Sequence, residues 1–348
     1  MKSPIRYISF LVCLLTLSSV LNILPPHANA QRQVKPAPPS PSPKLILQAQ
    51  QFQLLLDQTL HARSQGQPDK ALELSERALT LATKMNDQYS KAVSLNNMGS
   101  IYTDIGQPQK AMHYLQQALP LSRVPGDKAE EAVILTNIGN VYSHVSQWQK
   151  ALDCYQQALP LSRAAGDKAQ EGSILNNGGS AYYRVSQTLK ALDWLQKALP
   201  IRKALGDKRG VAVTLNNMGS LYGETGQLQK AIDFYQQALP LLQVAGDKAQ
   251  EAATLTNIGK MYSHAGQPQK ALEYLQQALQ IGKGLDDKGG EAATLNRIGN
   301  VYQRIGQGQK ALDFYQQVLP LLRAVGDKAG ETMTLTNIEV IKKAMGKP

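Results

Sequence analysis

The sequence predicts an all-α protein in which pairs of antiparallel helices stack into a solenoid. Three observations predict this fold. The 348-residue chain repeats itself at a step of 40 residues. Apolar residues within each repeat recur at spacings of three and four, the period of a helix with one buried face, and no segment alternates with the period of two typical of a strand. The Lys-Ala pair marks the step at 70–71, 110–111, 150–151, 190–191, 230–231, 270–271 and 310–311.

Residues 1–30 have the features of an export signal. Lys2 and Arg6 give a positive start, an apolar run follows over 7–24, and Ala28-Asn29-Ala30 has the small-x-small pattern of a signal-peptidase site. We expect cleavage near Ala30, a periplasmic or secreted location, and no membrane contact by the mature form. The alternative is an uncleaved anchor, because a run of about 18 residues can just span a bilayer. Pro25-Pro26 and the Ala-x-Ala pattern favour cleavage.

A Pro-rich linker and a basic repeat region follow. Residues 31–48, which begin QRQVKPAPPSPSPK, predict an extended spacer before a folded array over 49–348. The formal charge is +11, and removing Lys2 and Arg6 leaves +9. This balance favours an acidic partner or surface, although the charge is not gathered in one tract. Cys154 would be the single cysteine of the mature chain, so an internal disulfide is excluded.

Each repeat predicts two helices joined by a short turn, as residues 127–166 illustrate. Asp127 is placed to cap the first helix, and a turn at 145–148 separates it from the second helix. Gly166 closes the second helix. The apolar stripe of the first helix consists of Leu135, Ile138 and Tyr142. A small glycine recurs on the first helix, beginning at Gly99, and is expected to let neighbouring helices approach closely.

The second helices contain a recurring proline, at Pro120, Pro160, Pro200, Pro240 and Pro320. A proline inside a helix removes one hydrogen bond and kinks the helix. The pattern therefore predicts a bend or an early end at that point. The alternative is that each helix stops before its proline. About seven helix pairs are expected, and the final helix, 328–344, is left as a C-terminal cap.

These repeats resemble tetratricopeptide repeats. That family places a bulky residue, then Leu-Gly, then Tyr on the first helix, and Ala, an aromatic or Leu, and Ala on the second. The matching residues here are Leu95, Met98-Gly99, Tyr102, Ala111, Leu115 and Ala118. The resemblance covers about residues 49–346. It implies an α-solenoid that winds as a right-handed superhelix and presents a long concave surface.

The step of 40 exceeds the usual 34 residues of the family. This longer form resembles the arrays of kinesin light chains and spindle-orientation adaptors. The phrase GDK…TLNN…Y…GQ…KAL…YQQALPL resembles cyanobacterial arrays that are joined to caspase-like (CHAT) protease domains. No such domain is present among the 348 residues, so the resemblance implies an array without it.

No catalytic or metal-binding pattern is present. The chain has no H-E-x-x-H, C-x-x-C, P-loop or G-x-S-x-G. His144 and His264 share one repeat position but are three repeats apart, which is too far to hold one metal. Cys154 occupies a position that is aromatic in most other repeats, so packing explains it better than nucleophilic chemistry. We therefore expect no enzyme activity, no metal and no cofactor.

Polar side chains on the concave face form the candidate site. In the resembled family this part of the first helix lines the inner groove. One position per repeat, the Asn97 column, reads Asn97, Asn137, Asn177, Asn217, Asn257, Arg297 and Asn337. The neighbouring Asn96 column contains Asn96, Asn176, Asn216 and Asn296, with Thr136, Thr256 and Thr336 between them. Asn140 and Asn300 lie in a third column with Ser100, Ser180, Ser220 and Lys260. A fourth reads Asp104, His144, Arg184, Glu224, His264 and Arg304.

A carboxamide both donates and accepts, so it can pair with a peptide group as a strand does. Packed helices lie about 8–10 Å apart, and an extended chain advances about 3.3 Å per residue. One Asn per repeat would thus meet about every third residue of a bound segment. The resembled adaptors hold partner peptides with similar ladders. The alternative is that each Asn bonds backbone at the junction between repeats.

The predicted function is a non-catalytic, exported scaffold that binds an extended segment of another protein. The alternative is an accessory or targeting subunit for a separately encoded enzyme, such as a caspase-like protease. Nucleic acid is not an expected partner, because the fourth column mixes charges of both signs and the tyrosines belong to the core.

Overall fold

A computed structural model describes residues 42–123 and 127–346. Within these residues every regular element is a helix, and fifteen helices, α2–α16, follow one another as seven pairs and one final helix. The contacts divide the chain into two compact units, one ending at Ala181 and the other beginning at Tyr182. The predicted all-α solenoid of helix pairs is confirmed.

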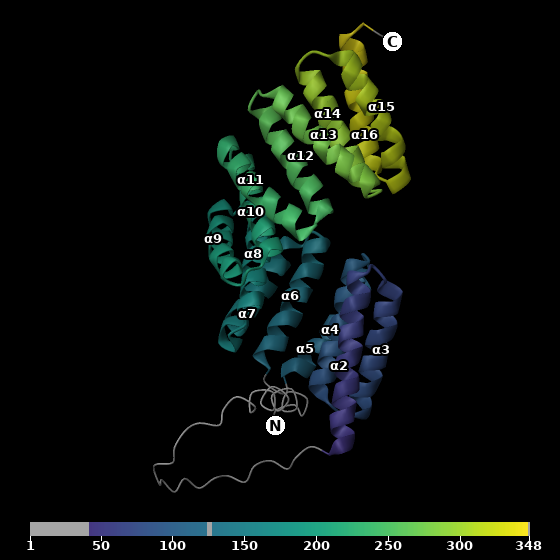
Figure 1. Cartoon of the computed structure of the whole chain (residues 1–348), viewed down its shortest axis with the longest axis vertical. Helices are drawn as coiled ribbons and strands as arrows, with labels where there is room; N and C mark the ends of the chain where they lie inside the picture. The colour runs from purple at the N-terminus through teal and green to yellow at the C-terminus, as the bar shows by residue number, and fades with distance from the viewer. Residues whose placement is uncertain (1–41, 124–126, 347–348) are drawn as a thin grey trace. The chain divides into compact units, whose positions relative to one another are not determined.

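The first unit contains three helix pairs and most of α8 (Lys168–Arg184). The pairs are α2 (Pro43–Ser64) with α3 (Pro68–Lys84), α4 (Gln88–Asp104) with α5 (Pro108–Arg123), and α6 (Lys128–His144) with α7 (Trp148–Ala165). Helices that follow one another from α2 to α7 pack together, as α2, α3 and α4 do in Figure 1. The first helices of successive pairs also touch, α2 with α4 and α4 with α6, and so form one layer.

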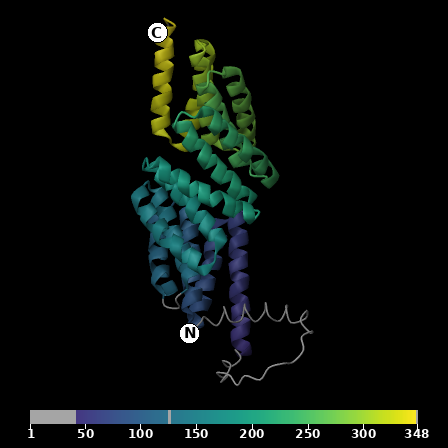
Figure 2. The same cartoon turned by 90° about the vertical axis from the view of Figure 1, so that its left-hand side faces the viewer.

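The second unit is built in the same way from α9 (Thr188–Ala204) onward. It contains α10 (Lys208–Glu224), α11 (Leu228–Ala245), α12 (Lys248–His264), α13 (Pro268–Gly284), α14 (Lys288–Arg304), α15 (Gly308–Val325) and α16 (Lys328–Ala344). The first helices α10, α12 and α14 again touch in succession. The last helix has the predicted bounds and packs against α15, at the edge of the unit (Figure 2).

The array begins at Pro43, inside the segment 31–48 that the sequence assigned to the linker. Ser42 caps α2, because its side chain accepts a hydrogen bond from the backbone N–H of Leu45 at 3.3 Å, and Pro43 occupies the first helical position. A serine followed by proline is thus a helix start here rather than part of a spacer. The predicted export signal and the linker up to residue 41 lie outside the described residues.

Aspartate caps and glycine ends set the step of the repeat. Asp127 accepts hydrogen bonds from the backbone N–H groups of Ala129 and Glu130, as the capping prediction requires. Equivalent aspartates also accept from the first turn: Asp87, Asp167, Asp207, Asp247, Asp287 and Asp327. Gly166 ends α7 with φ 72°, a left-handed conformation that costs glycine little. Both predicted helix boundaries are therefore confirmed.

The second helices continue through their prolines. Pro160, for example, lies inside α7, which runs on to Ala165. The helix therefore neither stops before this proline nor ends at it. Pro120, Pro160, Pro200, Pro240 and Pro320 are all exposed. The ring thus has room on the outer side of the helix, and water can satisfy the carbonyl that loses its N–H partner.

The two helices of a repeat approach closely at the recurring glycine. Gly299 of α14 lies against Tyr315 of α15, and a Cβ atom at position 299 would be 2.7 Å from the ring Cε1. The same contact pairs Gly99 with Leu115, Gly139 with Tyr155, Gly219 with Tyr235 and Gly259 with Leu275. The close packing predicted for these glycines is confirmed.

A stack of one lysine and two aromatic rings recurs beside this contact. The rings of Tyr102 and Tyr114 are nearly parallel, with centroids 5.4 Å apart, and Lys110 Nζ lies 5.2 Å from the Tyr102 centroid. The later Lys–Tyr pairs are Lys150–Tyr142, Lys190–Tyr182, Lys230–Tyr222, Lys270–Tyr262 and Lys310–Tyr302. Each such contact contributes about 0.5–1 kcal/mol at an exposed site.

We predict that Gly299→Ala destabilises the second unit by about 1–3 kcal/mol, because the new methyl group overlaps the Tyr315 ring. Gly289→Ala in the same helix is the matched control, since its Cβ would meet only Asp287 Oδ1 at 3.6 Å. That change should be neutral or stabilise by up to about 1 kcal/mol. Urea unfolding followed by circular dichroism measures both. Equal midpoints for the two variants would refute the packing role of Gly299.

Candidate functional site

The described residues offer no candidate for catalysis that stands on geometry. They contain no group of three His, Cys, Asp or Glu residues placed to hold a metal ion. Cys154 is buried, and burial and the nearby Asp153 raise the pKa of its thiol to about 11. The thiol therefore stays protonated near neutral pH, when a nucleophile needs the thiolate. None of the described helices combines the length and apolar character needed to cross a membrane.

The Asn97 column lies on the layer formed by the first helices. All seven of its side chains are half-buried: Asn97, Asn137 and Asn177 in the first unit, and Asn217, Asn257, Arg297 and Asn337 in the second. Contact between successive first helices sets this environment, because each position faces the next repeat on one side. An amide held there can reach a neighbouring repeat or a molecule lying across the layer.

In the first unit some of these amides bond to side chains of the previous repeat. Asn137 Nδ2 donates to Asn96 Oδ1 at 2.8 Å, and Asn177 Nδ2 donates to Asn140 Oδ1 at 3.0 Å. Asn140 also accepts from the Tyr155 hydroxyl at 2.8 Å. These bonds join repeats through side chains rather than through backbone groups. Asn97, in contrast, makes no hydrogen bond to another described residue.

The Asn96 column lies deeper than the Asn97 column. Asn96 and Asn176 are only 5% and 4% exposed. Asn96 Nδ2 donates to Glu130 Oε1 at 3.2 Å, and Asn176 Nδ2 donates to Asn177 Oδ1 at 3.2 Å. In the same column Thr136 accepts from Gln170 at 2.8 Å. These side chains are enclosed by the junction between repeats, which leaves a ligand little access to them.

The second unit divides the columns in the same way. Asn216 Nδ2 donates to Thr254 Oγ1 at 2.8 Å, and Asn300 accepts from the Tyr315 hydroxyl at 2.5 Å. Asn296 is half-buried, and its Oδ1 has no hydrogen-bond partner among the described residues. Asn257 and Asn337 make no hydrogen bond to other described residues. The amides free to meet a ligand in this unit are therefore Asn257 and Asn337.

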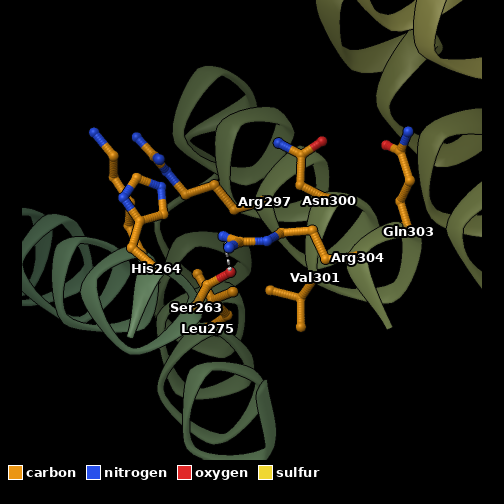
Figure 3. Close-up of a pocket in the computed structure, with 9 residues that line it drawn as sticks. Ser263, His264, Leu275, Arg297, Asn300, Val301, Gln303 and Arg304 are labelled. Atoms are coloured by element: carbon orange, nitrogen blue, oxygen red, sulfur yellow. Dashed lines mark hydrogen bonds between the residues drawn. The ribbon is translucent and has the colours of Figure 1, made fainter. Parts of the chain in front are cut away.

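Arg297 replaces asparagine in its column and lines a pocket of about 500 Å³ between α12 and α14 (Figure 3). Lys260 and His264 come from α12, and Arg297 and Arg304 from α14; we call these four residues the basic pocket. Partial burial, followed by the charges of Lys260, Arg304 and Arg297, lowers the pKa of His264 below its ordinary value. The remaining lining consists of Ser263, Leu275, Asn300, Val301 and Gln303.

The sequence contained the signal for the basic pocket, but the column analysis separated it. Lys260, His264, Arg297 and Arg304 stand in three different columns, each of which varies or breaks at that point. Only the packing of α12 against α14 shows that these breaks coincide in space. Helical spacing places 260 beside 264 and, on the next first helix, 297 beside 304, so adjacent repeats should be compared together.

The comparisons with known proteins agree with this architecture. A tetratricopeptide-repeat model matches residues 59–123, 130–204, 175–243 and 210–284, and a second one matches 292–326. Curated proteins gave no match.

Many solved structures are similar. The apo form of the quorum sensor NprR from B. thuringiensis has a TM-score of 0.68 and 16% identity, covering 87% of this chain and 83% of that chain. NprR with its cognate peptide NprX has a TM-score of 0.57 and 16% identity, covering 85% and 83%. A signal transduction ATPase with a tetratricopeptide repeat sensor from Pyrococcus horikoshii has a TM-score of 0.64 and 17% identity, covering 86% and 50%.

We predict different costs for two adjacent asparagines of α4. Asn96→Ala removes a buried amide that bonds to Glu130 and Asn137, and should destabilise the first unit by about 1–3 kcal/mol. Asn97→Ala is the matched control. It removes no hydrogen bond to the described chain and introduces a better helix former, so its effect should stay within about 0.5 kcal/mol. Thermal unfolding of both variants measures the difference. A larger loss for Asn97→Ala would contradict the structural role of Asn96.

Proposed function

Because this chain belongs to the tetratricopeptide-repeat family, we propose that it is a protein-interaction scaffold that holds an extended segment of a partner against its first helices. The observation that carries the proposal is the set of half-buried amides without a protein partner, namely Asn97, Asn257 and Asn337. Each can donate to one peptide group and accept from the same group. A half-buried amide left unbonded is costly, and a bound backbone would satisfy it.

The proposal divides the asparagines into two tasks. Asn96, Asn137, Asn140 and Asn177 hold successive repeats of the first unit in register through their mutual hydrogen bonds. Asn97 of that unit, and Asn257 and Asn337 of the second, bind the backbone of the segment. The columns that vary along the chain then select its side chains.

Two further points support the scaffold. NprR, whose structure is similar, has been crystallised in complex with its cognate peptide NprX. The first helices of successive repeats touch, so their spacing of about 8–10 Å fits every third residue of an extended chain. The proposal requires no chemistry, in keeping with the generally non-catalytic role of this family.

The test begins with a displayed peptide library that is selected on the purified chain. Selected peptides are then measured by calorimetry against Asn257→Ala and Asn337→Ala. Losing a donor and an acceptor should weaken binding about tenfold for each change. Gln316→Ala is the matched control, because it removes an exposed amide from the second helix α15. It should leave the affinity unchanged.

Two outcomes would contradict the proposal. One is a chain that selects no peptide at all. The other is full affinity in the double variant Asn257→Ala/Asn337→Ala while its melting temperature equals that of the parent chain. A change in affinity that tracks a loss of folded protein is separated from a lost contact by measuring unfolding on the same samples.

We also propose that the chain is exported, on the basis of Lys2, Arg6, the apolar run over 7–24 and Ala28-Asn29-Ala30. The mature protein should then begin at Gln31. Mass spectrometry of the N-terminal peptide from a periplasmic or culture fraction measures this. An intact N-terminus in the membrane fraction would support the uncleaved anchor, and an intact N-terminus in the cytosol would refute export.

A further inference from the structure

We propose that the basic pocket of the second unit binds an oxyanionic group with two negative charges on the partner segment. Two sources share this chemistry, a phosphorylated side chain and a pair of adjacent carboxylates. The inference rests on the proposed function, since the anion is presented by the segment that the first helices hold.

The first argument is the composition of the pocket. Four of its nine lining residues are basic, and none is acidic. Lys260, Arg297 and Arg304 carry fixed charges, so the pocket holds three positive charges when His264 is neutral and four when it is protonated. A group with one negative charge would leave most of this charge uncompensated. Two negative charges on neighbouring oxygens match it better, and guanidinium groups bind such oxygens in pairs.

The second argument is that no protein group neutralises these charges. Lys260, His264, Arg297 and Arg304 form no ion pair with a residue of the described chain. Arg304 donates to the Ser263 hydroxyl at 3.3 Å, as the dashed line in Figure 3 shows. Arg297 is half-buried, and its Nε atom has no hydrogen-bond partner among the described residues. A buried guanidinium without a counter-charge is costly, whereas surface arginines elsewhere in this chain pair with glutamates.

The third argument is the space at Leu275. Tyr155, Tyr235 and Tyr315 occupy the equivalent position in other repeats, where their hydroxyls bond to Asn140, Ser220 and Asn300. Leu275 has no hydroxyl, and it lines the basic pocket below Lys260 in the same repeat. An oxygen that bonds to the polar layer is thus supplied by the protein in those three repeats. In this repeat we assign that place to an oxygen of the ligand.

An adjoining hollow indicates how the segment continues. It holds about 220 Å³ and shares Arg297 with the basic pocket. Its walls include Ala253 and Ala293, and Asn257, one of the amides proposed to bind backbone, also lines it. A segment that places its anion at Arg297 therefore passes Asn257 and meets small side chains, which leave room for an apolar residue next to the charged one.

A protein segment fits better than a nucleic acid. No aromatic side chain lines either the basic pocket or the hollow, so bases would lack a stacking partner. Glu224 of α10 lies near Tyr235, whose pKa it raises while Arg297 lowers it, so an acidic residue stands close to the pocket. A long polyanion that continued past the pocket along α10 would approach this carboxylate.

Binding should depend on pH through His264. Its neighbours are Lys260 on its own helix and Arg297 and Arg304 on α14, all cationic, with Glu224 and Tyr235 farther off beside Arg297. These cations and partial burial lower the pKa of His264 in the free chain. A bound anion raises that pKa, so binding takes up a proton and becomes tighter as pH falls through the raised value. Carboxylate peptides are used for this measurement, because a phosphate also gains a proton near pKa 6.

The experiment uses the full chain and short peptides that differ only at a central pair: Glu-Glu, phosphoserine-Gln or Gln-Gln. We expect at least one charged peptide to bind about tenfold or more tightly than the Gln-Gln peptide. Arg297→Asn should remove most of this advantage, and Asn already occupies that column in the other repeats. Lys260→Ser, a residue found at 100, 180 and 220, is the second variant. Lys288→Gln, an exposed lysine of the same helix α14, is the charge-matched control and should change affinity less than twofold.

A second readout needs no peptide. The His264 ring signal, assigned by its loss in His264→Gln, should move on adding inorganic phosphate, while the His144 signal should not. Glu-Glu binding should strengthen between about pH 7.5 and 5.5, and lose this dependence in His264→Gln.

The outcomes separate the two proposals. If the Gln-Gln peptide binds as well as both charged peptides, the anion site is refuted and the scaffold stands. If no peptide binds but phosphate moves the His264 signal, the scaffold is refuted and the anion site stands. Equal loss in Lys288→Gln and Arg297→Asn would reduce the effect to general charge and refute the site. So would tighter binding of a single-stranded oligonucleotide than of either charged peptide.

Discussion

The close approach of two helices at one glycine per repeat is the constraint on which the rest of the structure depends. Without a Cβ at Gly139, Gly219 or Gly299, the ring of the facing tyrosine can lie directly against the first helix. That position brings the tyrosine hydroxyl to the opposite side of the layer, where it bonds to Asn140, Ser220 or Asn300. The core thus extends into the polar surface, and the environment of the polar columns is set by packing beneath them.

Most of the fold follows from the sequence because its determinants are local. Asp127 and its equivalents cap helices through bonds to the next turn, and Gly166 ends a helix through its own backbone conformation. The prolines were harder to interpret, because their effect depends on which side of the helix they face. An outward ring leaves the unpaired carbonyl to water, so the helix continues beyond Pro160. The start at Pro43 depended on one cap, Ser42, within a segment of otherwise unstructured composition.

The candidate site was only partly predictable, for a related reason. Repetition identified the asparagine columns, but it made their members look equivalent. Whether an amide is bonded depends on the residue that the preceding repeat offers: Asn96 receives Asn137, whereas Asn97 and Asn257 have no such partner. The basic pocket depends on the coincidence of four substitutions and one shorter core residue, Leu275, on three helices. Each looked like variation within its own column.

The stack of Lys110, Tyr102 and Tyr114 has a consequence for how such a chain changes over time. All three residues belong to one helix pair, so the contact forms inside a single copy and makes no demand on its neighbours. A duplication or deletion of 40 residues would carry the whole stack with it and leave no ring or ammonium group without its mate. The length of the array can therefore change by whole copies, while the side chains that distinguish one copy from another diverge on the opposite face.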